Sequence, residues 1–284
     1  MSNHSYESTS RSVECPSGKL HYHEAGDGPS LILLHGSGPG VSGWANFSDT
    51  LTSFSDRYRC IVPDFPGYGG SDAVEGNPIE VCVAAVIQLM DALEIDKAHL
   101  IGNSLGGMVG ALLAAHQAGR VDRFVSIGGL GMNLFSSFPP EGIIRLSEFA
   151  EDPSKDKIIA WLSSMVFDRA LITEELIEQR MQQALEPKTL ATTRQLYSRA
   201  ALDGMAQMFA GPNATRRIAH LSSITAPTLL TWGRDDRVTP VDMALLPMKL
   251  IPNCELHVFP NCGHWAMIER RSEFNAVVSA FLSK

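Results

Sequence analysis

The sequence is poor in cysteine, and its cysteines are not arranged for metal or redox work. There are five of them, scattered along the chain, and no two form a C-x-x-C pair. This spacing predicts neither a zinc site nor a dithiol redox site. We therefore expect reduced thiols, no metal, no cofactor and a cytoplasmic location. The cysteines are Cys15, Cys60, Cys82, Cys254 and Cys262.

Long apolar runs are also missing. No stretch of about 18 apolar residues occurs, which argues against a membrane-spanning helix. The segment from Met1 to Ser12 is polar and rich in Ser and Thr, and it has neither the basic start nor the apolar stretch of a secretory signal. We expect this segment to be a frayed tail.

Basic residues are in the minority. The chain has 23 Lys and Arg against 31 Asp and Glu, a net charge of −8, which disfavours phosphate backbones and anionic membrane surfaces. We expect no nucleic acid and no membrane as partner. With 284 residues, 44% of them hydrophobic, the chain can form one large core, so we predict one catalytic domain with a small lid.

Short β-type runs alternate with longer helical patterns, which indicates an α/β fold built from parallel βαβ units. The runs Leu31 to Leu34 and Thr228 to Leu230 are continuously apolar, as is typical of strands covered by helices on both faces. We predict a mostly parallel sheet whose first two strands form an antiparallel edge. The eight predicted strands are 12–15, 19–24, 30–35, 59–63, 98–103, 124–128, 228–233 and 255–259.

Strand patterns stop between Met132 and Gly211, where helical patterns take over. We predict an inserted helical lid at 132–211 and a core made of 1–131 and 212–284. One lid helix is expected to begin after Thr173, whose hydroxyl can cap it, with Glu174 and Glu175 in its first turn.

The strongest local motif is Gly102-Asn103-Ser104-Leu105-Gly106, a G-x-S-x-G sequence between a predicted strand and a predicted helix at 107–118. The two glycines permit the sharp turn that lifts Ser104 Oγ above the sheet, and the Leu105 amide at the helix start can face a developing oxyanion. This context predicts that Ser104 is a nucleophile.

A serine nucleophile needs a base, and His264 is the best of the nine histidines. It lies in the loop Cys262-Gly263-His264-Trp265, just after the last predicted strand. The other histidines have structural or solvated interpretations. His99 and His257 lie in strands, His116 lies on a helix, His220 lies in a connector, and His4, His21 and His23 lie near the exposed start.

The acid that orients the base should follow the preceding strand, where Asp235 and Asp236 both stand. We choose Asp236, which is farther into the turn, and assign Asp235 to turn hydrogen bonds or a surface pair. The chain order Ser, Asp, His is that of α/β-hydrolases.

The segment from His35 to Gly40 reads His-Gly-Ser-Gly-Pro-Gly after the third predicted strand. Such a run lets backbone amides approach a substrate oxygen, so the Ser37 amide should be the second oxyanion donor; a flexible turn is the alternative. We assign the Gly- and Pro-rich segment 64–71 to structure. A turn at Asn46 could direct its amide into the cavity.

These motifs together resemble the meta-cleavage product hydrolases, a family with the α/β-hydrolase fold. The resemblance covers nearly the whole chain and rests on four segments. They are His-Gly-Ser-Gly-Pro-Gly at 35–40, Gly-Asn-Ser-Leu-Gly-Gly at 102–107, Gly-Arg-Asp-Asp-Arg at 233–237 and Cys-Gly-His-Trp at 262–265.

The resemblance implies hydrolysis of a carbon–carbon bond in 2-hydroxy-6-oxohexa-2,4-dienoates, giving 2-hydroxypenta-2,4-dienoate and a carboxylic acid. It also supports Asp236 as the acid of the triad. The cation needed for the substrate's carboxylate and enolate would be Arg180, on a predicted lid helix beside Leu176 and Ile177. A surface arginine is the alternative for this residue. The other implied substrate contacts are Gly36, Ser37, Gly38, Asn46, Asn103 and Trp265.

Other functions of the same triad stay open. A carboxylesterase or lactonase would use Ser104, Asp236 and His264 without needing Arg180, and a ligand receptor would keep the fold as a binding module. We expect a small-molecule dienoate as the ligand, and the resemblance suggests a homo-oligomer. The C6 substituent of the substrate, and the group that drives its tautomerisation, are not indicated by the sequence.

Overall fold

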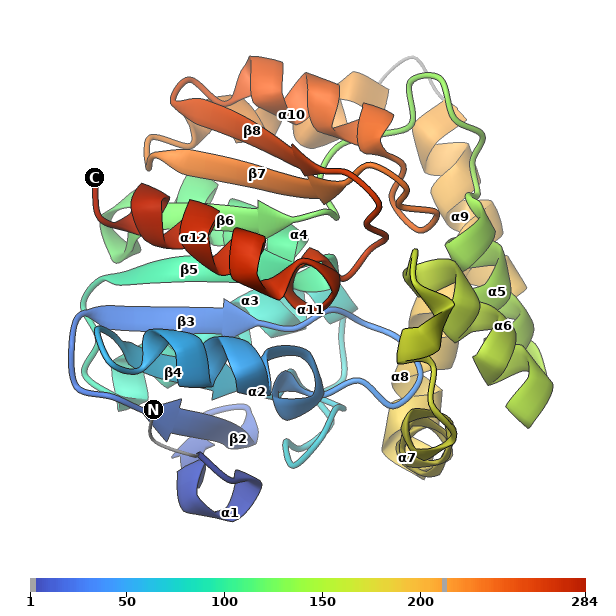
Figure 1. Cartoon of the computed structure of the whole chain (residues 1–284), viewed down its shortest axis with the longest axis horizontal. Coiled ribbons are helices and arrows are strands. Elements are labelled where there is room, and N and C mark those ends of the chain that lie inside the picture. Colours follow the sequence, from blue (N-terminus) through green and yellow to red (C-terminus); the bar gives the residue numbers. More distant parts are fainter. Residues whose placement is uncertain (1–3, 211–213) are drawn as a thin grey trace.

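The computed structural model describes residues 4–210 and 214–284 and has an eight-stranded sheet at its centre (Figure 1). The strand order is β1-β2-β4-β3-β5-β6-β7-β8. The strands β1 and β2 pair antiparallel, as do β2 and β4, whereas all other neighbours are parallel. The predicted α/β class, the mostly parallel sheet and its antiparallel edge are confirmed. The strands are β1 (Ser10–Cys15), β2 (Gly18–Ala25), β3 (Ser30–Leu34), β4 (Arg59–Pro63), β5 (Ala98–Asn103), β6 (Val121–Ile127), β7 (Thr228–Gly233) and β8 (Cys254–Phe259).

Helices cover both faces of the sheet (Figure 1). The helices α2 and α12 pack on one face through apolar side chains such as Phe47 and Phe274. The helices α3 and α4 pack on the other face through side chains such as Leu89 and Val109. The bounds are α1 (Tyr6–Thr9), α2 (Gly43–Phe54), α3 (Pro78–Ala92), α4 (Leu105–His116), η1 (Ala118–Arg120), α10 (Leu245–Leu250), α11 (Ala266–Glu269) and α12 (Arg271–Leu282), with the 3-10 helices η3 (Ala214–Ser223) and η4 (Val241–Ala244) before α10.

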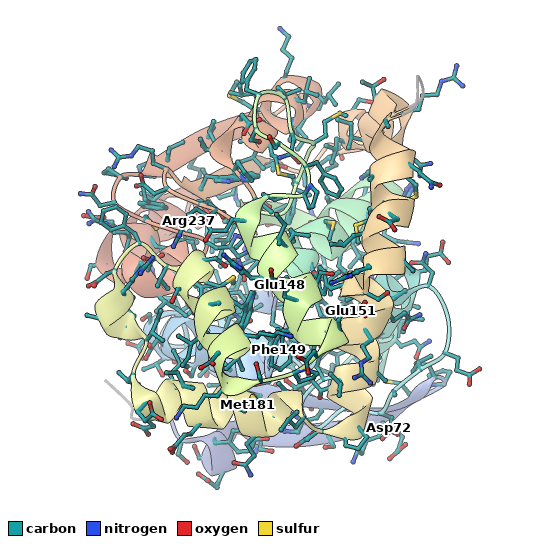
Figure 2. The ribbon with its side chains drawn as sticks, turned by 90° about the vertical axis from the view of Figure 1, so that its right-hand side faces the viewer. Asp72, Glu148, Phe149, Glu151, Met181 and Arg237 are labelled. Carbon is teal, nitrogen blue, oxygen red and sulfur yellow. The ribbon has the colours of Figure 1, made fainter. Side chains whose placement is uncertain are left out.

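Between β6 and β7 the chain forms a group of helices that we call the lid helices. They are α5 (Glu141–Glu151), α6 (Lys155–Met165), α7 (Glu174–Ala184), α8 (Pro187–Tyr197) and α9 (Arg199–Ala210), with the short 3-10 helix η2 (Arg169–Leu171). They stand at one end of the sheet and are seen face on in Figure 2. Thr173 caps α7 through a hydrogen bond from the Leu176 amide, as predicted. The last predicted lid residue, 211, lies outside the described residues.

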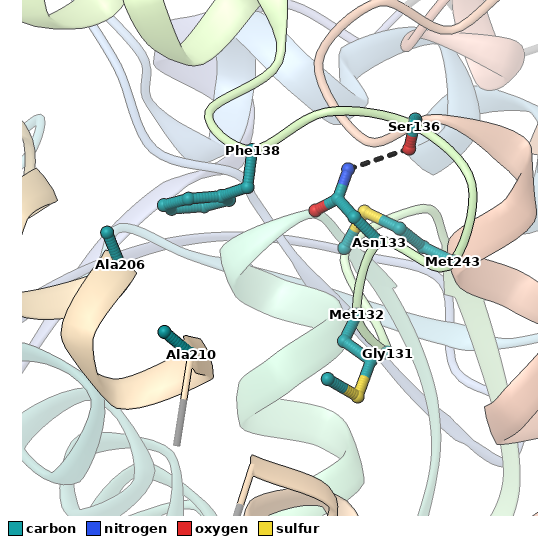
Figure 3. A pocket seen from close by; sticks show the side chains of 8 residues that line it. All are labelled: Gly131, Met132, Asn133, Ser136, Phe138, Ala206, Ala210 and Met243. Carbon is teal, nitrogen blue, oxygen red and sulfur yellow. Dashed lines mark hydrogen bonds between the residues drawn. The ribbon is translucent and has the colours of Figure 1, made fainter. Parts of the chain in front are cut away.

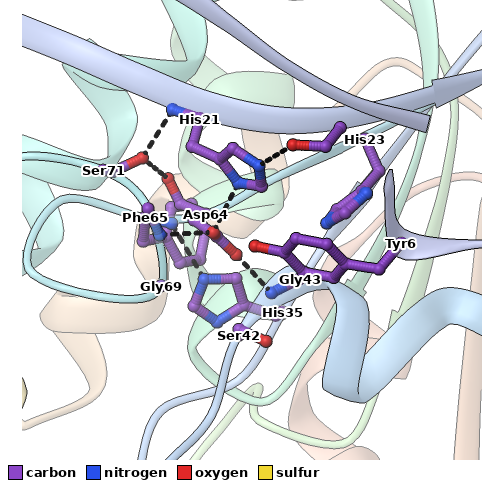
Figure 4. Close-up of polar contacts among 12 residues, drawn as sticks. Tyr6, His21, His23, His35, Ser42, Gly43, Asp64, Phe65, Gly69 and Ser71 are labelled. Atoms are coloured by element: carbon purple, nitrogen blue, oxygen red, sulfur yellow. Dashed lines mark hydrogen bonds and ion pairs between the residues drawn. The ribbon is translucent and has the colours of Figure 1, made fainter. Parts of the chain in front are cut away.

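The prediction of a frayed N-terminal tail is wrong for residues 4–12. A capping box at Ser5 begins α1, and β1 follows directly. Thr9 Oγ1 lies 2.9 Å from His23 Nδ1. The Tyr6 ring packs edge-on against His23 (Figure 4). His21 and His23 are therefore buried rather than exposed. Residues 1–3 lie outside the described residues.

Three further expectations can be compared with the fold. Asn46 lies in α2 and not in a turn, because Ser42 caps that helix four residues earlier. None of the five cysteines is in a disulfide. Among the described helices, none is both long enough and apolar enough to cross a membrane.

Candidate active site

The turn between β5 and α4 holds Ser104 in a strained conformation. Its φ is 53° and its ψ is −111°, a region that non-glycine residues occupy only when the surrounding structure enforces it. The flanking glycines are needed for space. A Cβ on Gly102 would lie 2.2 Å from the Gly106 carbonyl oxygen, and one on Gly106 would lie 2.0 Å from that of Leu34. Leu105 begins α4, two residues before the predicted helix start, so its amide stands at a helix N-terminus.

The structure brings His264 to Asp236 and not to Asp235. His264 Nδ1 lies 2.7 Å from Asp236 Oδ2, with both side chains buried. The other bonds to the Asp236 carboxylate come from the backbone amides of Val238 and Thr239 and from the Thr239 hydroxyl. Asp235 is partly exposed and pairs with its neighbour Arg234. The carboxylate of Asp236 is thus fixed where it can orient the imidazole.

Two consecutive glycines after β6 pack against His264 and Ser104 and so bring these two residues to the same place. A Cβ on Gly128 would lie 3.2 Å from His264 Cε1, and one on Gly129 would lie 2.6 Å from Ser104 Cα. Within 4–210 and 214–284, no hydrogen bond joins Ser104 Oγ to His264. Catalytic hydrogen bonds of this kind commonly tighten when substrate binds.

The glycine-rich segment from Gly36 to Gly40, which we call the oxyanion loop, connects β3 to α2 above Ser104. A Cβ on Gly36 would lie 3.4 Å from Ser104 Cβ. His35 orients this loop because its Nε2 accepts the Phe65 amide at 2.8 Å, which leaves Nδ1 to donate to the Gly36 carbonyl at 2.6 Å. Burial lowers the pKa of His35, which keeps this neutral tautomer in place.

The segment that we assigned to structure contributes Asp64, a buried carboxylate at the centre of a polar network (Figure 4). Asp64 accepts hydrogen bonds from the Gly43 and Gly70 amides, and its Oδ2 lies 2.8 Å from His21 Nδ1. Burial alone would raise the pKa of Asp64, but these hydrogen bonds hold it below its ordinary value. Because Gly43 is the first residue of α2, Asp64 fixes the helix that carries Asn46.

Ser37 has a lid partner that sequence reasoning missed. Its Oγ lies 2.5 Å from the hydroxyl of Tyr197 on α8, and both residues are buried. The pair joins the oxyanion loop to the lid helices. No sequence pattern singles out Tyr197, because its partner is 160 residues away along the chain.

Arg180 lies on α7 and is almost completely buried, with 2% of its surface exposed. Its Nη1 donates to the Gly40 carbonyl at 2.9 Å, and its guanidinium lies over the Trp265 ring at 5.4 Å from the centroid. No carboxylate among the described residues pairs with it. Burial lowers its pKa to about 10, so the guanidinium is still charged at neutral pH.

Two asparagines tie these parts together. Asn103 Nδ2 donates to the carbonyls of Ile127 at 3.1 Å and His264 at 3.5 Å. Asn46 Oδ1 accepts the Gly36 amide at 3.4 Å. The predicted substrate contacts thus surround Ser104 and the oxyanion loop, and their roles toward a substrate stay predictions.

His264 and its loop are also hydrogen-bonded to the lid helices, a link that the sequence does not predict. The His264 amide donates to the Met165 carbonyl at 2.7 Å. The Glu269 carboxylate accepts the Gly263 amide at 2.7 Å on one oxygen, and the amides of Phe167 and Asp168 on the other. Burial raises the pKa of Glu269, and these amides counteract part of that effect.

A cavity of about 380 Å³ opens between the segment after β6 and the helix α9 (Figure 3). Its walls are largely apolar, and Asn133 Nδ2 donates to Ser136 Oγ at 2.8 Å on one side. The lining residues are Gly131, Met132, Asn133, Ser136, Phe138, Ala206, Ala210 and Met243. Gly131 lies two residues beyond Gly129, the glycine that packs on Ser104.

No cluster of three or more His, Cys, Asp or Glu side chains suited to a metal ion occurs in the described part of the chain. The structure brings together the Ser104 hydroxyl, an imidazole bonded to a carboxylate, and a buried cation. The roles of Ser104 as nucleophile, of His264 as base and of the Ser37 and Leu105 amides as oxyanion donors stay predictions.

Comparison with known proteins gives consistent results. The family model for the alpha/beta hydrolase fold matches residues 29–271. The 2-hydroxy-6-oxo-6-phenylhexa-2,4-dienoate hydrolase of Burkholderia cepacia is 39% identical, over 93% of this chain and 91% of its own. The 2-hydroxy-6-oxononadienedioate/2-hydroxy-6-oxononatrienedioate hydrolase of Burkholderia vietnamiensis is 37% identical, over 94% and 91%.

Solved structures agree with these relatives. The meta-cleavage product hydrolase from Pseudomonas fluorescens IP01 superposes with a TM-score of 0.81 at 32% identity, over 97% of this chain and 98% of its own. On the matched family model, the relatives and this structural likeness, the chain belongs to the meta-cleavage product hydrolases of the α/β hydrolase fold.

Proposed function

We propose that the chain hydrolyses the carbon–carbon bond beside the C6 ketone of a 2-hydroxy-6-oxohexa-2,4-dienoate. One water is consumed, and the products are 2-hydroxypenta-2,4-dienoate and the carboxylic acid that carries the C6 substituent. Such substrates are ring-fission products of aromatic compounds, so the reaction belongs to aromatic degradation.

The buried guanidinium of Arg180 is the observation that carries this proposal. A buried cation that has no carboxylate partner lowers the stability of the folded protein. A dienoate has a carboxylate and an adjacent enol oxygen, which offset that cost when they bind. An ordinary esterase needs no such cation, because its leaving group is an oxygen and not a carbon.

In the mechanism that we propose, Arg180, Asn103 and Trp265 favour the charge-delocalised form of the substrate, which then takes its keto form by protonation at C5. His264 accepts the proton of Ser104 Oγ as this oxygen attacks the C6 carbonyl. The Ser37 and Leu105 amides stabilise the resulting oxyanion.

Collapse of this intermediate breaks the C5–C6 bond. The electron pair leaves with C5 as a dienolate, to which His264 returns a proton, and an acyl group stays on Ser104. His264 then activates water, which attacks the acyl carbon and releases the carboxylic acid.

The cavity beyond Gly129 has the size and lining for an apolar C6 substituent. Its Met and Phe side chains can pack against a ring or an alkyl chain, and the short side chains of Ala206 and Ala210 leave room for it. We propose that this cavity accepts part of that group.

The test is loss of the yellow dienolate absorbance for substrates with methyl, phenyl and larger C6 groups. We expect Arg180→Gln to lower kcat/KM for dienoates by about 100-fold or more, since a hydrogen-bonded charge pair is worth about 3 kcal/mol. Hydrolysis of a simple aryl ester should change little. The matched control is Arg145→Gln, which removes a half-exposed lid arginine paired with Glu148. If the wild-type protein consumed no dienoate of this series but hydrolysed the aryl ester, a carboxylesterase or lactonase would be favoured instead.

We further propose that the enzyme works in the cytoplasm as a homo-oligomer. The absence of disulfides among its five cysteines supports the first point, and the family resemblance supports the second. Light scattering coupled to size-exclusion chromatography would give the oligomeric state.

A further inference from the structure

Three buried N–H groups around the oxyanion loop have no hydrogen-bond acceptor. They are Asn46 Nδ2, Arg180 Nε and Trp161 Nε1. They come from α2, α7 and α6, three helices that meet at this loop. Asn46 and Arg180 are expected substrate contacts, whereas Trp161 has no assigned role.

Each of the three side chains contacts a different residue of the loop. Asn46 accepts the Gly36 amide, and Arg180 donates to the Gly40 carbonyl. Trp161 packs against Gly38 between them, so closely that a Cβ there would lie 2.7 Å from Trp161 Cζ2. The three donors therefore follow the loop from one end to the other.

Trp161 and Arg180 also share a second neighbour. The Trp161 ring meets Trp265 edge to face at 6.2 Å between centroids, and the Arg180 guanidinium lies over the same Trp265 ring. The indole N–H and the guanidinium are thus held around one aromatic wall.

The unpaired state of Trp161 is informative because its ring is completely buried, with 0% of its surface exposed. A buried donor without an acceptor destabilises a protein, and native structures rarely keep one without a use. Trp232 is equally buried, but its Nε1 donates to the Thr239 carbonyl at 2.6 Å. The indole N–H of Trp232, in the sheet, thus has an acceptor, whereas that of Trp161, beside the oxyanion loop, has none.

We propose that Trp161 binds the substrate, donating its indole N–H to an oxygen at the polar end of the dienoate. That end has three oxygens, two in the carboxylate and one on C2, and Asn46, Arg180 and Trp161 each hold an unpaired N–H donor that can reach such an oxygen. This inference rests on the proposed function and adds a specificity-determining residue to it. Trp161 selects substrates with an anionic, oxygen-rich end over plain esters.

The test measures binding apart from turnover, in a Ser104→Ala background where the dienoate stays intact. Affinity and the visible spectrum of the bound dienolate are compared for Trp161, Trp161→Phe and an isosteric 3-benzothienylalanine at position 161, which keeps the bicyclic shape but lacks the N–H. We expect both replacements to weaken binding by about 10- to 100-fold, the range for a hydrogen bond to a charged group, and to shift the spectrum of the bound dienolate. The loss should be the same for methyl and phenyl C6 groups, because all substrates share the polar end.

The outcomes separate the possible failures. Unchanged affinity with the isosteric analogue would overturn the proposal. A loss that varies with the C6 substituent would also overturn it, since Trp161 would then belong to the substituent pocket. If the Ser104→Ala protein with Trp161 bound no dienoate and wild type consumed none, the proposed function would fail first.

A stability comparison keeps the result interpretable. Trp161→Phe breaks no hydrogen bond, whereas Trp232→Phe breaks one. We expect the second variant to lose more thermal stability, by a few degrees in Tm. A Trp161→Phe protein that melts no earlier than Trp232→Phe but binds dienoate weakly supports a direct contact with substrate.

Discussion

At the scale of single residues, Asp236 has almost no freedom to act as anything but the partner of His264. One of its carboxylate oxygens accepts two backbone amides, and the other lies within hydrogen-bond distance of the Thr239 hydroxyl and of His264. A carboxylate held in this way selects one tautomer and one orientation of the imidazole. Asp235, its neighbour, faces Arg234 at the surface.

This difference predicts opposite results for two conservative changes. Asp236→Asn should lower kcat by about 10³- to 10⁴-fold, because an amide in this place favours the wrong tautomer of His264. Asp235→Asn is the matched control and should stay within about threefold of wild type, since surface pairs contribute little. Steady-state kinetics on a dienoate would measure both. A larger effect from Asp235→Asn would contradict the assignment.

At the scale of elements, Glu269 at the end of α11 connects the loop of the base to the joint between α6 and η2. Its carboxylate accepts backbone amides from both sides, Gly263 on one and Phe167 and Asp168 on the other. Such charge-assisted bonds are stronger than neutral ones, and they fix backbone rather than flexible side chains.

Replacing this carboxylate should loosen the two elements together. Glu269→Gln places an amide nitrogen against one of the two sets of backbone N–H groups. We expect the free energy of unfolding to fall by about 1–3 kcal/mol. We also expect kcat to fall by a larger factor than KM changes. Chemical denaturation and kinetics would measure these effects. Glu273→Gln, which breaks an exposed pair with Arg270, should change the free energy of unfolding much less. Equal effects of the two changes would show that Glu269 has no special role.

The sequence predicts the positions of helices and strands better than it predicts contacts between distant residues. The strands 59–63, 98–103 and 228–233 have their predicted bounds, because continuous apolar runs bounded by turn residues indicate buried parallel strands. The turn at 102–106, the oxyanion loop and the loop at 262–265 are local motifs, so the sequence places them directly.

Contacts between distant segments could not be predicted in this way. The pairing of Ser37 with Tyr197 and the packing of Trp161 on Gly38 join residues more than a hundred positions apart. The polar composition of the N-terminal segment predicted a tail. The segment is ordered because its polar side chains hydrogen-bond one another and two buried histidines. Hydrophobic patterning does not report such polar contacts.

At the scale of the whole molecule, the lid helices are not a separate body. Trp161 and Leu162 of α6 and Ile177 of α7 belong to the same apolar cluster as Phe47 of α2 and Phe274 of α12. The lid helices and one face of the sheet thus share a continuous core. The N-terminal segment closes the molecule at the far edge, where Tyr6 packs against His23.

The buried His23 gives the folded protein a defined response to acid. Burial lowers its pKa from 6.5 to about 4, so the unfolded chain binds a proton in this range whereas the folded chain does not. The contribution of His23 to stability should therefore fall as the pH drops from about 6.5 to about 4, by roughly 1–2 kcal/mol once solvent screening is allowed for.

Urea denaturation at a series of pH values would measure this response. His23→Asn, whose side-chain amide can still hydrogen-bond Thr9, should unfold earlier at pH 7 but show a flatter decline toward acid. His257→Asn, on β8, changes a histidine far from the N-terminal segment and serves as the comparison. If both variants flattened the profile equally, His23 would not be the cause.

The hydrogen bond from the His264 amide to the Met165 carbonyl has a consequence for the timing of each reaction cycle. Met165 is the last residue of α6, so any movement of α6 that admits a substrate also pulls on the backbone of the base. A displacement of α6 would therefore displace the His264 backbone as well, and the imidazole would regain its place only when α6 returned. No reaction would then occur while substrate enters or product leaves, and Ser104 could attack the C6 carbonyl only after bulk water had been excluded from the site.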